Sequence, residues 1–134
     1  MTSTLSEGVR KLFQGKNFAH VATLMPDGSP HVSPVWIDVL DNHLVFNSDE
    51  SYVKVKNLHR DPRVAVSILD HEDPYRSAFL RGRVVEFRHE GAAAHIDKLA
   101  KKYLGMDTYP YHQPDEQRVI VTIEPERVAS QGID

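Results

Sequence analysis

Cationic and amide side chains gather in one short stretch of the chain, residues 47–62 (NSDESYVKVKNLHRDP). The stretch follows an apolar, strand-like run and ends at Asp61-Pro62, where a helix must stop. The free N–H groups and the macrodipole at a helix N-terminus favour an anion. Four donors lie close together: Lys54, Lys56, Asn57 and Arg60. This stretch therefore indicates a phosphate site built on a short helix.

Helical spacing divides these donors between two faces. At about 100° per residue, Lys54 and Asn57 share one face, whereas Lys56 and Arg60 share another. We therefore expect Lys54 and Asn57 to form the phosphate pair, with Lys54 exposed on the first turn. The alternative is that Lys54, Lys56 and Arg60 simply make a solvated helix face, as charged runs usually do.

Composition limits the classes of protein to which the chain can belong. Its 134 residues predict a single domain over 1–134, and 40% hydrophobic with 26% charged residues is typical of a soluble globular protein. A formal net charge of −3 argues against a general nucleic-acid binder. The chain has no cysteine, which excludes disulfides and thiolate sites. No signal peptide or membrane-spanning run is visible, so we expect a cytoplasmic protein without nucleic-acid or membrane partners.

Hydrophobic periodicity predicts a mainly β protein with short helices. Strand-like runs occupy residues 18–25, 30–40, 43–47, 63–69, 76–88 and 118–123. Helical patterns occupy residues 4–13, with a capping box at Thr4-Leu5-Ser6-Glu7, the central stretch, and residues 91–104 with Gly105 as a cap. Pro26-Asp27-Gly28-Ser29 predicts a hairpin turn, and Gly82 inside a long strand predicts a bulge. Six strands with short links suggest an antiparallel β-barrel.

Common catalytic and metal-binding motifs are absent from the sequence. The eight histidines form neither H-E-x-x-H nor a close pair, so the spacing predicts no metal site. No G-x-S-x-G elbow and no glycine-rich P-loop occurs. Hydrolase and nucleotide-triphosphatase activities therefore have no support.

The order of these parts resembles the flavin/deazaflavin-binding split β-barrel family, which includes pyridoxamine-5′-phosphate oxidase and the smaller F420-dependent reductases. The similar segments are FAHVATLMPDGSPHVSPVWID, LVFNSDESYVKVKNLHRDPRVAVSIL, LRGRVVE and RVIVTIEPERV, which together span most of residues 18–128. The most specific part is S-x-x-x-x-x-K-x-x-N-L-x-x-D-P-R-V, from Ser48 to Val64. The resemblance implies a six-stranded split barrel that pairs as a homodimer, with the cofactor in a groove lined by both subunits.

The resemblance also implies roles for particular residues. The K-x-x-N positions, Lys54 and Asn57, would lie near the cofactor phosphate, and the S-P-V-W segment would carry the ring system. Lys56 and Arg60 would be second candidates for the phosphate or an acidic tail. The residues implied for cofactor binding are Ser33, Pro34, Val35, Trp36, Ser48, Lys54, Lys56, Asn57 and Arg60.

The chain looks more like the F420-dependent reductases than the oxidases. The oxidases that resemble this fold carry a further C-terminal segment with Arg and His, whereas this chain stops soon after Pro125-Glu126-Arg127-Val128. We therefore expect F420 as the cofactor, with FMN as the alternative. A rival of another class is a non-catalytic carrier of F420, FMN or haem.

The implied reaction is hydride transfer from reduced F420 to a conjugated acceptor, such as an enone, a quinone-like ring or a tetrapyrrole. A proton donor is not obvious. His31 and Tyr75 are candidates, although each could be structural and solvent could serve instead.

Further aromatic and basic residues have two interpretations each. Trp36 could stack on the ring or belong to the core, and Tyr109 and Tyr111 could form a lid or a packed loop. Three arginines alternate with apolar residues: Arg76, Arg81 and Arg83. The pair Arg81 and Arg83, which shares one face and flanks Gly82, could hold an anionic cofactor tail or an acidic substrate, or could pair with Glu86 or with carboxylates of a second subunit.

Overall fold

The computed structural model describes residues 2–133; residues 1 and 134, the ends of the predicted domain, lie outside the described part. The helices are α1 (Glu7–Gln14), α2 (Val53–Arg60) and α3 (Ala92–Leu104). The strands are β1 (Ala19–Leu24), β2 (Pro30–Val35), β3 (Ile37–Leu40), β4 (His43–Asp49), β5 (Arg63–Leu69), β6 (Ser77–Arg88) and β7 (Arg118–Gln131). Within the described residues, no helix is long and apolar enough to cross a membrane.

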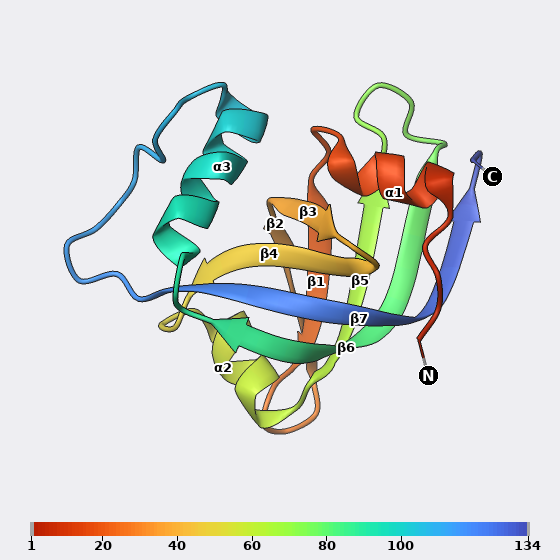
Figure 1. The fold of residues 1–134 in the computed structure, drawn as a ribbon. Coiled ribbons are helices and arrows are strands. Elements are labelled where there is room, and N and C mark those ends of the chain that lie inside the picture. Colours follow the sequence, from red (N-terminus) through yellow and green to blue (C-terminus); the bar gives the residue numbers. More distant parts are fainter. Residues whose placement is uncertain (1, 134) are drawn as a thin grey trace.

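All strands belong to one antiparallel sheet in the order β2-β1-β5-β6-β7-β4-β3. The sheet curls into a half-barrel of the split-barrel kind, with α1 and α2 at opposite ends and α3 beside β4 (Figure 1). Its two outermost strands, β2 and β3, are joined in the chain by Trp36 alone. The curled sheet therefore brings both of its edges to one residue.

The prediction of six strands is wrong at one place, because the run from Pro30 to Leu40 forms two strands rather than one. Residues up to Val35 pair with β1, whereas Ile37 and its successors pair with β4 at the other side of the barrel. A run that changes its pairing partner must leave the ladder at the crossing point, and here that point is Trp36. The alternation of side chains between the two faces continues through Trp36, so the sequence pattern does not reveal the break between β2 and β3.

Local signals explain how the elements begin and end. The predicted hairpin is confirmed, with Met25 N donating to Ser29 O at 2.8 Å and Gly28 at a φ of 86°. The capping box predicted at Thr4 is wrong, because the N-cap of α1 is Ser6, two residues later, and the Ser6 hydroxyl accepts from Val9 N. Gly105, at a φ of 73°, ends α3 as predicted.

The bulge predicted at Gly82 is confirmed by a register shift between β6 and β7 at Arg81 and Gly82. A Cβ at Gly82 would lie 2.2 Å from the carbonyl oxygen of Glu124, so a side chain has no room. The last strand continues to Gln131, well beyond the predicted end at residue 123. Pro125 does not end it, because this residue lies opposite Gly82 at the bulge, where the ladder is already irregular.

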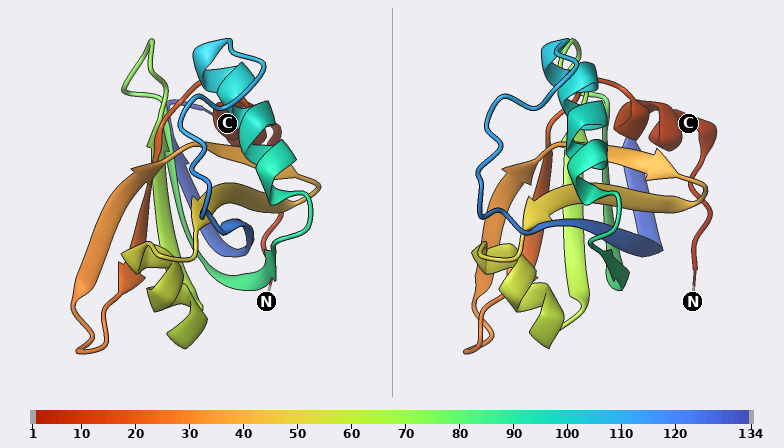
Figure 2. Two further views of the ribbon diagram at one scale, coloured as in Figure 1. Left: turned by 90° about the vertical axis from the view of Figure 1, so that its left-hand side faces the viewer. Right: turned by 60° about the vertical axis from the view of Figure 1, so that its left-hand side comes forward.

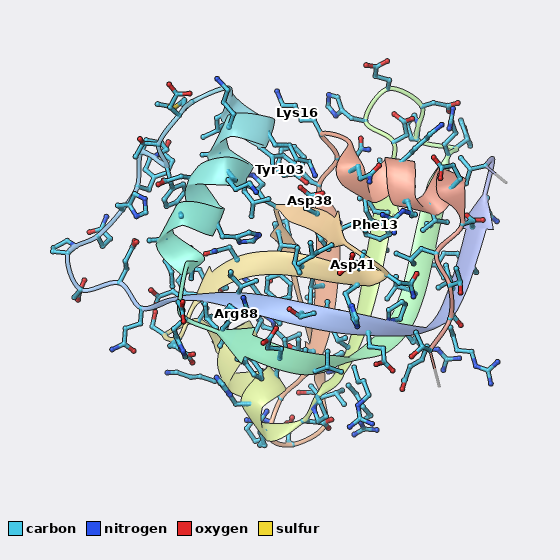
Figure 3. All side chains as sticks on the ribbon, viewed as in Figure 1. Phe13, Lys16, Asp38, Asp41, Arg88 and Tyr103 are labelled. Carbon is cyan, nitrogen blue, oxygen red and sulfur yellow. The ribbon has the colours of Figure 1, made fainter. Side chains whose placement is uncertain are left out.

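Buried apolar side chains from the sheet, α1 and α2 form one core, whereas α3 packs its own small cluster at the edge where β2 and β3 meet. The Tyr103 hydroxyl donates to Asn17 O at 2.7 Å and accepts from Ile37 N at 3.1 Å. Burial raises the pKa of Tyr103 to about 12, which keeps this donor protonated. Figure 3 shows Tyr103 on α3 near Asp38 and Phe13. In this way α3 is fixed against the first residue of β3.

Candidate functional site

A cavity of about 330 Å³ opens where the two sheet edges meet. Its lining comes from the β2–β3 junction, β4, the start of α2, and the segment of residues 105–117 that connects α3 to β7. We call this segment the strap, and Figure 2 shows its course from α3 to β7. The lining residues are Phe18, Pro34, Val35, Trp36, Asn47, Ser48, Tyr52, Lys54, Ile96, Tyr109, Tyr111 and Arg118. Its size is at the lower end of the range of about 300–1,000 Å³ that is usual for ligand sites.

Lys54 contributes a buried positive charge to this cavity. The residue is only 9% exposed, which corrects the expectation of an exposed lysine. Its Nζ donates to Ser33 Oγ at 3.2 Å and lies 5.1 Å from the centre of the Tyr52 ring. Burial lowers the pKa of Lys54, and no carboxylate of the described residues compensates it. A bound anion would supply the missing counter-charge.

A half-buried lysine on α3, Lys102, shows the contrast. Lys102 Nζ donates to Phe13 O at 2.9 Å and to Ile37 O at 2.6 Å, with Asp38 at 3.9 Å. These partners hold α3 against the sheet and satisfy the ammonium group. Lys102 is therefore structural, whereas the ammonium group of Lys54 has further N–H groups that could bind a ligand.

Two further polar atoms of the cavity are buried without a hydrogen-bond partner among residues 2–133. One is Ser48 Oγ, next to Asn47 on β4, and the other is Nε of Arg118 at the start of β7. The Arg118 side chain is nine-tenths buried, lies 4.8 Å from the Tyr109 ring centre, and donates to Asn47 Oδ1 at 3.4 Å. Arg118 Nε is balanced by an ion pair with Glu116 Oε1 at 3.6 Å. Buried polar groups normally have partners, so Ser48 Oγ is the atom that marks a place for a polar ligand.

Asn47 is held in one orientation by its other contacts. Its Nδ2 donates to Ala92 O at 2.8 Å and lies 3.0 Å from Nδ1 of His95. Burial lowers the pKa of His95, which favours the neutral ring with Nδ1 as an acceptor. The Asn47 carbonyl oxygen therefore faces Arg118.

Aromatic rings form the apolar wall of the cavity. Trp36 stacks on Tyr103 with ring centres 5.3 Å apart and planes at 7°, and meets Tyr109 edge-on at 5.9 Å. Tyr111 in turn meets Tyr109 edge-on at 5.6 Å. A cavity with one aromatic wall and separate cationic donors suits a ligand that has a planar ring and an anionic group.

The cavity brings together part of the predicted cofactor set. Pro34, Val35, Trp36, Ser48 and Lys54 all line it. Ser33 joins them through its contact with Lys54.

The remaining members of α2 lie outside the cavity lining. Asn57 is buried on the same helix face as Lys54, but its Nδ2 donates to Thr23 Oγ1 at 3.0 Å and its Oδ1 accepts from Arg60. Arg60 also donates to Leu24 O at 2.7 Å, so these two residues attach α2 to β1. Lys56 is exposed on the outer face.

The two predicted proton donors do not line the cavity. His31 lies on the same side of β2 as Ser33, and its Nδ1 is buried without a partner in the described part of the chain. Tyr75 is 87% exposed on the loop between β5 and β6.

The arginines of β6 lie on the face of the sheet opposite the core. Arg81 lines two larger hollows there, of about 620 and 510 Å³, together with Ala22, Ala65 and Arg127. Arg83 lies opposite Arg63 in the ladder. These hollows contain no buried unpartnered polar atom of the described chain, so we place the site in the smaller cavity.

Arg76 and Glu86 each form an ion pair with another partner. Arg76 Nε lies 3.8 Å from Asp70, and Glu86 pairs with Arg88 at 3.3 Å rather than with Arg81 or Arg83. No group of three or more His, Asp or Glu between residues 2 and 133 is arranged to hold a metal ion.

Phe18, Asn47, Tyr52 and Arg118 line the cavity but were not predicted as site residues. Arg118 belongs to the site because β7 pairs with β4, which places Arg118 opposite Asp49 and beside Ser48. The two strands are separated by about half of the chain, and nothing local to residue 118 indicates that pairing. The one local signal that Arg118 could belong to a site is its position just after the irregular, aromatic segment that contains Tyr109 and Tyr111.

The known proteins can now be compared with this geometry. The family model described as pyridoxamine 5′-phosphate oxidase matches residues 5–132, nearly the whole chain. The chain belongs to this family. The family binds flavins and includes F420 reductases. No curated protein is significantly similar to the chain in sequence.

Several solved structures are similar to this chain in fold. A structure named F420 reductase is 29% identical, with a TM-score of 0.81 over 93% of this chain and 98% of that one. A conserved hypothetical protein from Mycobacterium tuberculosis is 24% identical, with a TM-score of 0.75 over 97% and 86%. A FAD-binding protein from Mesorhizobium loti is 23% identical, with a TM-score of 0.69 over 97% and 96%. The last two likenesses concern the fold alone.

Proposed function

We propose that the protein is an F420-dependent oxidoreductase that transfers a hydride from reduced F420 to a conjugated small molecule, such as an enone, a quinone-like ring or a tetrapyrrole. The observation that carries the proposal is the buried Lys54 without a counter-charge, beside the unpartnered hydroxyl of Ser48 and an aromatic wall. The likeness to an F420 reductase supports the choice of the deazaflavin.

The residues present suit a phosphorylated ring cofactor. Lys54 and Ser48 would hold the phosphate, and Ser33 accepts a hydrogen bond from Lys54 Nζ, which helps to fix the ammonium group. Trp36 and the strap tyrosines would bound the ring and exclude water from it. When bound, the cofactor supplies the hydride chemistry. The chain itself provides position and positive potential, and solvent is the proton source we favour, since neither His31 nor Tyr75 lines the cavity.

An FMN-dependent oxidoreductase is the second candidate. The same Lys54 and Ser48 site would serve the phosphate of FMN, and flavin binding is the shared property of the family. A non-catalytic carrier of F420, FMN or haem is the third candidate, which differs from the others in lacking turnover.

The test is a titration of the purified protein with F420 and, separately, with FMN, followed by fluorescence. We expect F420 to bind at least tenfold more tightly than FMN, and the reduced complex to be oxidised by an enone or quinone acceptor. A preference for FMN would replace F420 in the proposal. Tight binding without turnover of any acceptor would favour the carrier, and binding of neither would refute the phosphate site.

We also propose that the protein forms a homodimer, with the cofactor groove completed by the second subunit. A cavity of about 330 Å³ that opens to the surface would enclose only part of a flavin or deazaflavin. The face of the sheet opposite the core exposes large apolar side chains that one chain cannot cover. Val32 is 63% and Phe79 50% exposed on this face.

The proposed dimer predicts a single molar mass of twice the monomer in sedimentation experiments. Phe79→Asp should shift the protein to the monomer, because a buried, unpaired carboxylate at the interface would be strongly unfavourable. Leu104→Asp is the matched control, since Leu104 is an exposed apolar residue on α3, away from that face. Circular dichroism checks that both variants fold. A parent protein that sediments as a monomer would contradict the proposal.

A further inference from the structure

The strap, residues 105–117, has no regular secondary structure, and side chains hold most of it in place. Within the described residues, its backbone–backbone hydrogen bonds lie near its two ends: two to Ala100 and Lys101 of α3 at its start, and, at its end, one from Glu116 to Gln113 and one in which Gln117 O accepts from Glu50 N. Figure 2 shows it running free of the sheet from the end of α3 to the start of β7. It carries Tyr109 and Tyr111 into the cavity lining. Its attachment therefore decides whether the aromatic wall is complete.

One histidine joins the middle of the strap to α3 and to the end of the strap that precedes β7. His112 Nε2 lies 2.9 Å from Asp97 Oδ1 on α3. Its Nδ1 lies 2.5 Å from Glu116 Oε2 near the start of β7. The same Asp97 oxygen accepts from Tyr109 N at 2.8 Å, and the His112 ring meets the Tyr109 ring edge-on at 5.3 Å. Tyr109 is thus fixed by the carboxylate that His112 binds.

The two contacts require a proton on each ring nitrogen. A carboxylate can only accept, and a neutral imidazole has a single N–H. The doubly protonated ring satisfies both Asp97 and Glu116, whereas the neutral ring would turn a lone pair toward one of them. The observed geometry is therefore that of the imidazolium.

We propose that His112 is a positioning residue, a proton-operated latch that holds the strap over the cofactor cavity when protonated and releases Tyr109 and Tyr111 when it loses its proton. The proposal deepens the proposed cofactor site and depends on it only for the consequence for ligand binding. The movement of the strap itself can be measured without a cofactor.

Charged and titratable groups from each neighbouring element support this assignment. Asp97 faces His112 from α3, Glu116 and Tyr109 face it from the strap, and Arg118 on β7 lies 3.6 Å from Glu116. Hydrogen bonds to Asp97 and then Glu116 raise the pKa of His112. The Tyr109 backbone and then His112 lower the pKa of Asp97. Burial alone would raise the pKa of Glu116, but its bonds to Gln113 and His112 keep that pKa low.

The sign of the pH dependence follows from these directions. Because its pKa is raised, the protonated His112 stabilises the closed strap. This contribution is fully present at pH values below the free histidine pKa of about 6.5, and it is lost as the pH rises through the pKa of His112 in the folded protein. On the acid side, the latch weakens only when Asp97 and Glu116 become protonated. The closed strap is therefore the form that predominates at pH values below the raised pKa of His112 and above the lowered pKa values of Asp97 and Glu116.

Trp36 provides a direct readout, because it is the only tryptophan of the chain and contacts Tyr109. We would follow its emission and its quenching by acrylamide in the cofactor-free protein from about pH 5.5 to 9. The open fraction should rise on the order of tenfold across the transition, because one charge-assisted hydrogen bond is lost. The midpoint should lie above the ordinary histidine value of about 6.5.

Three variants separate the latch from other titrations. His112→Gln keeps an amide donor but cannot titrate, so the transition should vanish. Asp97→Asn removes one carboxylate and should move the midpoint to lower pH, which a purely structural role would not do. His71→Gln is the control, since His71 lies on the distant β5–β6 loop. The pH transition of Trp36 emission in this variant should have the same midpoint as in the parent.

A transition that persists in His112→Gln would overturn the proposal, and so would a parent emission that does not respond to pH in this range. If circular dichroism shows that His112→Gln does not fold, the Asp97→Asn variant tests the proposal instead. A midpoint that does not move to lower pH in that variant would overturn it. Failure of F420 or FMN to bind would refute the proposed function and leave the latch standing. Binding without a pH response of Trp36 would refute the latch alone.

Discussion

Replacing Lys54 with alanine is expected to weaken cofactor binding by about 10- to 100-fold, because a charge-assisted hydrogen bond to a phosphate contributes about 1.5–3 kcal/mol. The fold should remain intact, and the thermal midpoint should be unchanged or slightly higher. The reason is that the substitution removes a buried ammonium group that has a hydroxyl and a ring as neighbours but no counter-charge. Fluorescence titration and thermal unfolding measure the two effects.

Lys56→Ala is the matched comparison, since Lys56 lies two residues further along α2 on its exposed face. We expect this variant to bind within about twofold of the parent, because an exposed charge is largely screened. The opposite order of effects would move the phosphate to the outer face of α2. Equal binding by the parent and the Lys54 variant would remove the phosphate site from this cavity.

Gly82→Ala should destabilise the protein by about 3 kcal/mol, in the upper range for a single substitution. The added Cβ would lie 2.2 Å from the Glu124 carbonyl oxygen and 3.1 Å from its carbon. These are backbone atoms of the paired strand, so relief requires β6 and β7 to separate at the bulge. Equilibrium unfolding in urea measures the difference in the free energy of unfolding, with one m-value used for both parent and variant.

Gly28→Ala separates steric contact from backbone strain. Gly28 has a φ of 86° but no atom within 4 Å of its ideal Cβ, so this variant tests the left-handed conformation alone, at about 1–2 kcal/mol. The Gly82 variant should therefore lose more stability than the Gly28 variant. A smaller loss at Gly82 would mean that the strands separate there easily.

Local signals in the sequence predict most of the elements. Alternation over residues 63–69 coincides with β5 as the structure has it, and the turn at Gly28 and the bulge at Gly82 follow from what glycine alone permits. Apart from the start of α1, the boundaries that were wrong are those where strand pairing overrides the local pattern. The break at Trp36 and the extension of β7 past Pro125 both depend on which distant strand lies alongside.

The site was less accessible from the sequence than the fold. Helical spacing places Lys54 and Asn57 on one face, and both are indeed buried on one side of α2. Spacing alone does not distinguish a side chain that faces a cavity from one that attaches the helix to β1, as Asn57 does. Arg118, Asn47 and the His112 contacts are formed by residues far apart in the chain, so no local pattern could reveal them.

The junction of β2 and β3 at Trp36 bears on how such a site can change over evolutionary time. No ladder joins these two strands, so the order of the sheet is maintained through the other five. Trp36 therefore has no strand partner whose register its substitution could disturb. A side chain at this junction can be exchanged with little penalty to the pairing of the sheet, and the wall that would meet a ligand ring can diversify while the barrel around it stays the same.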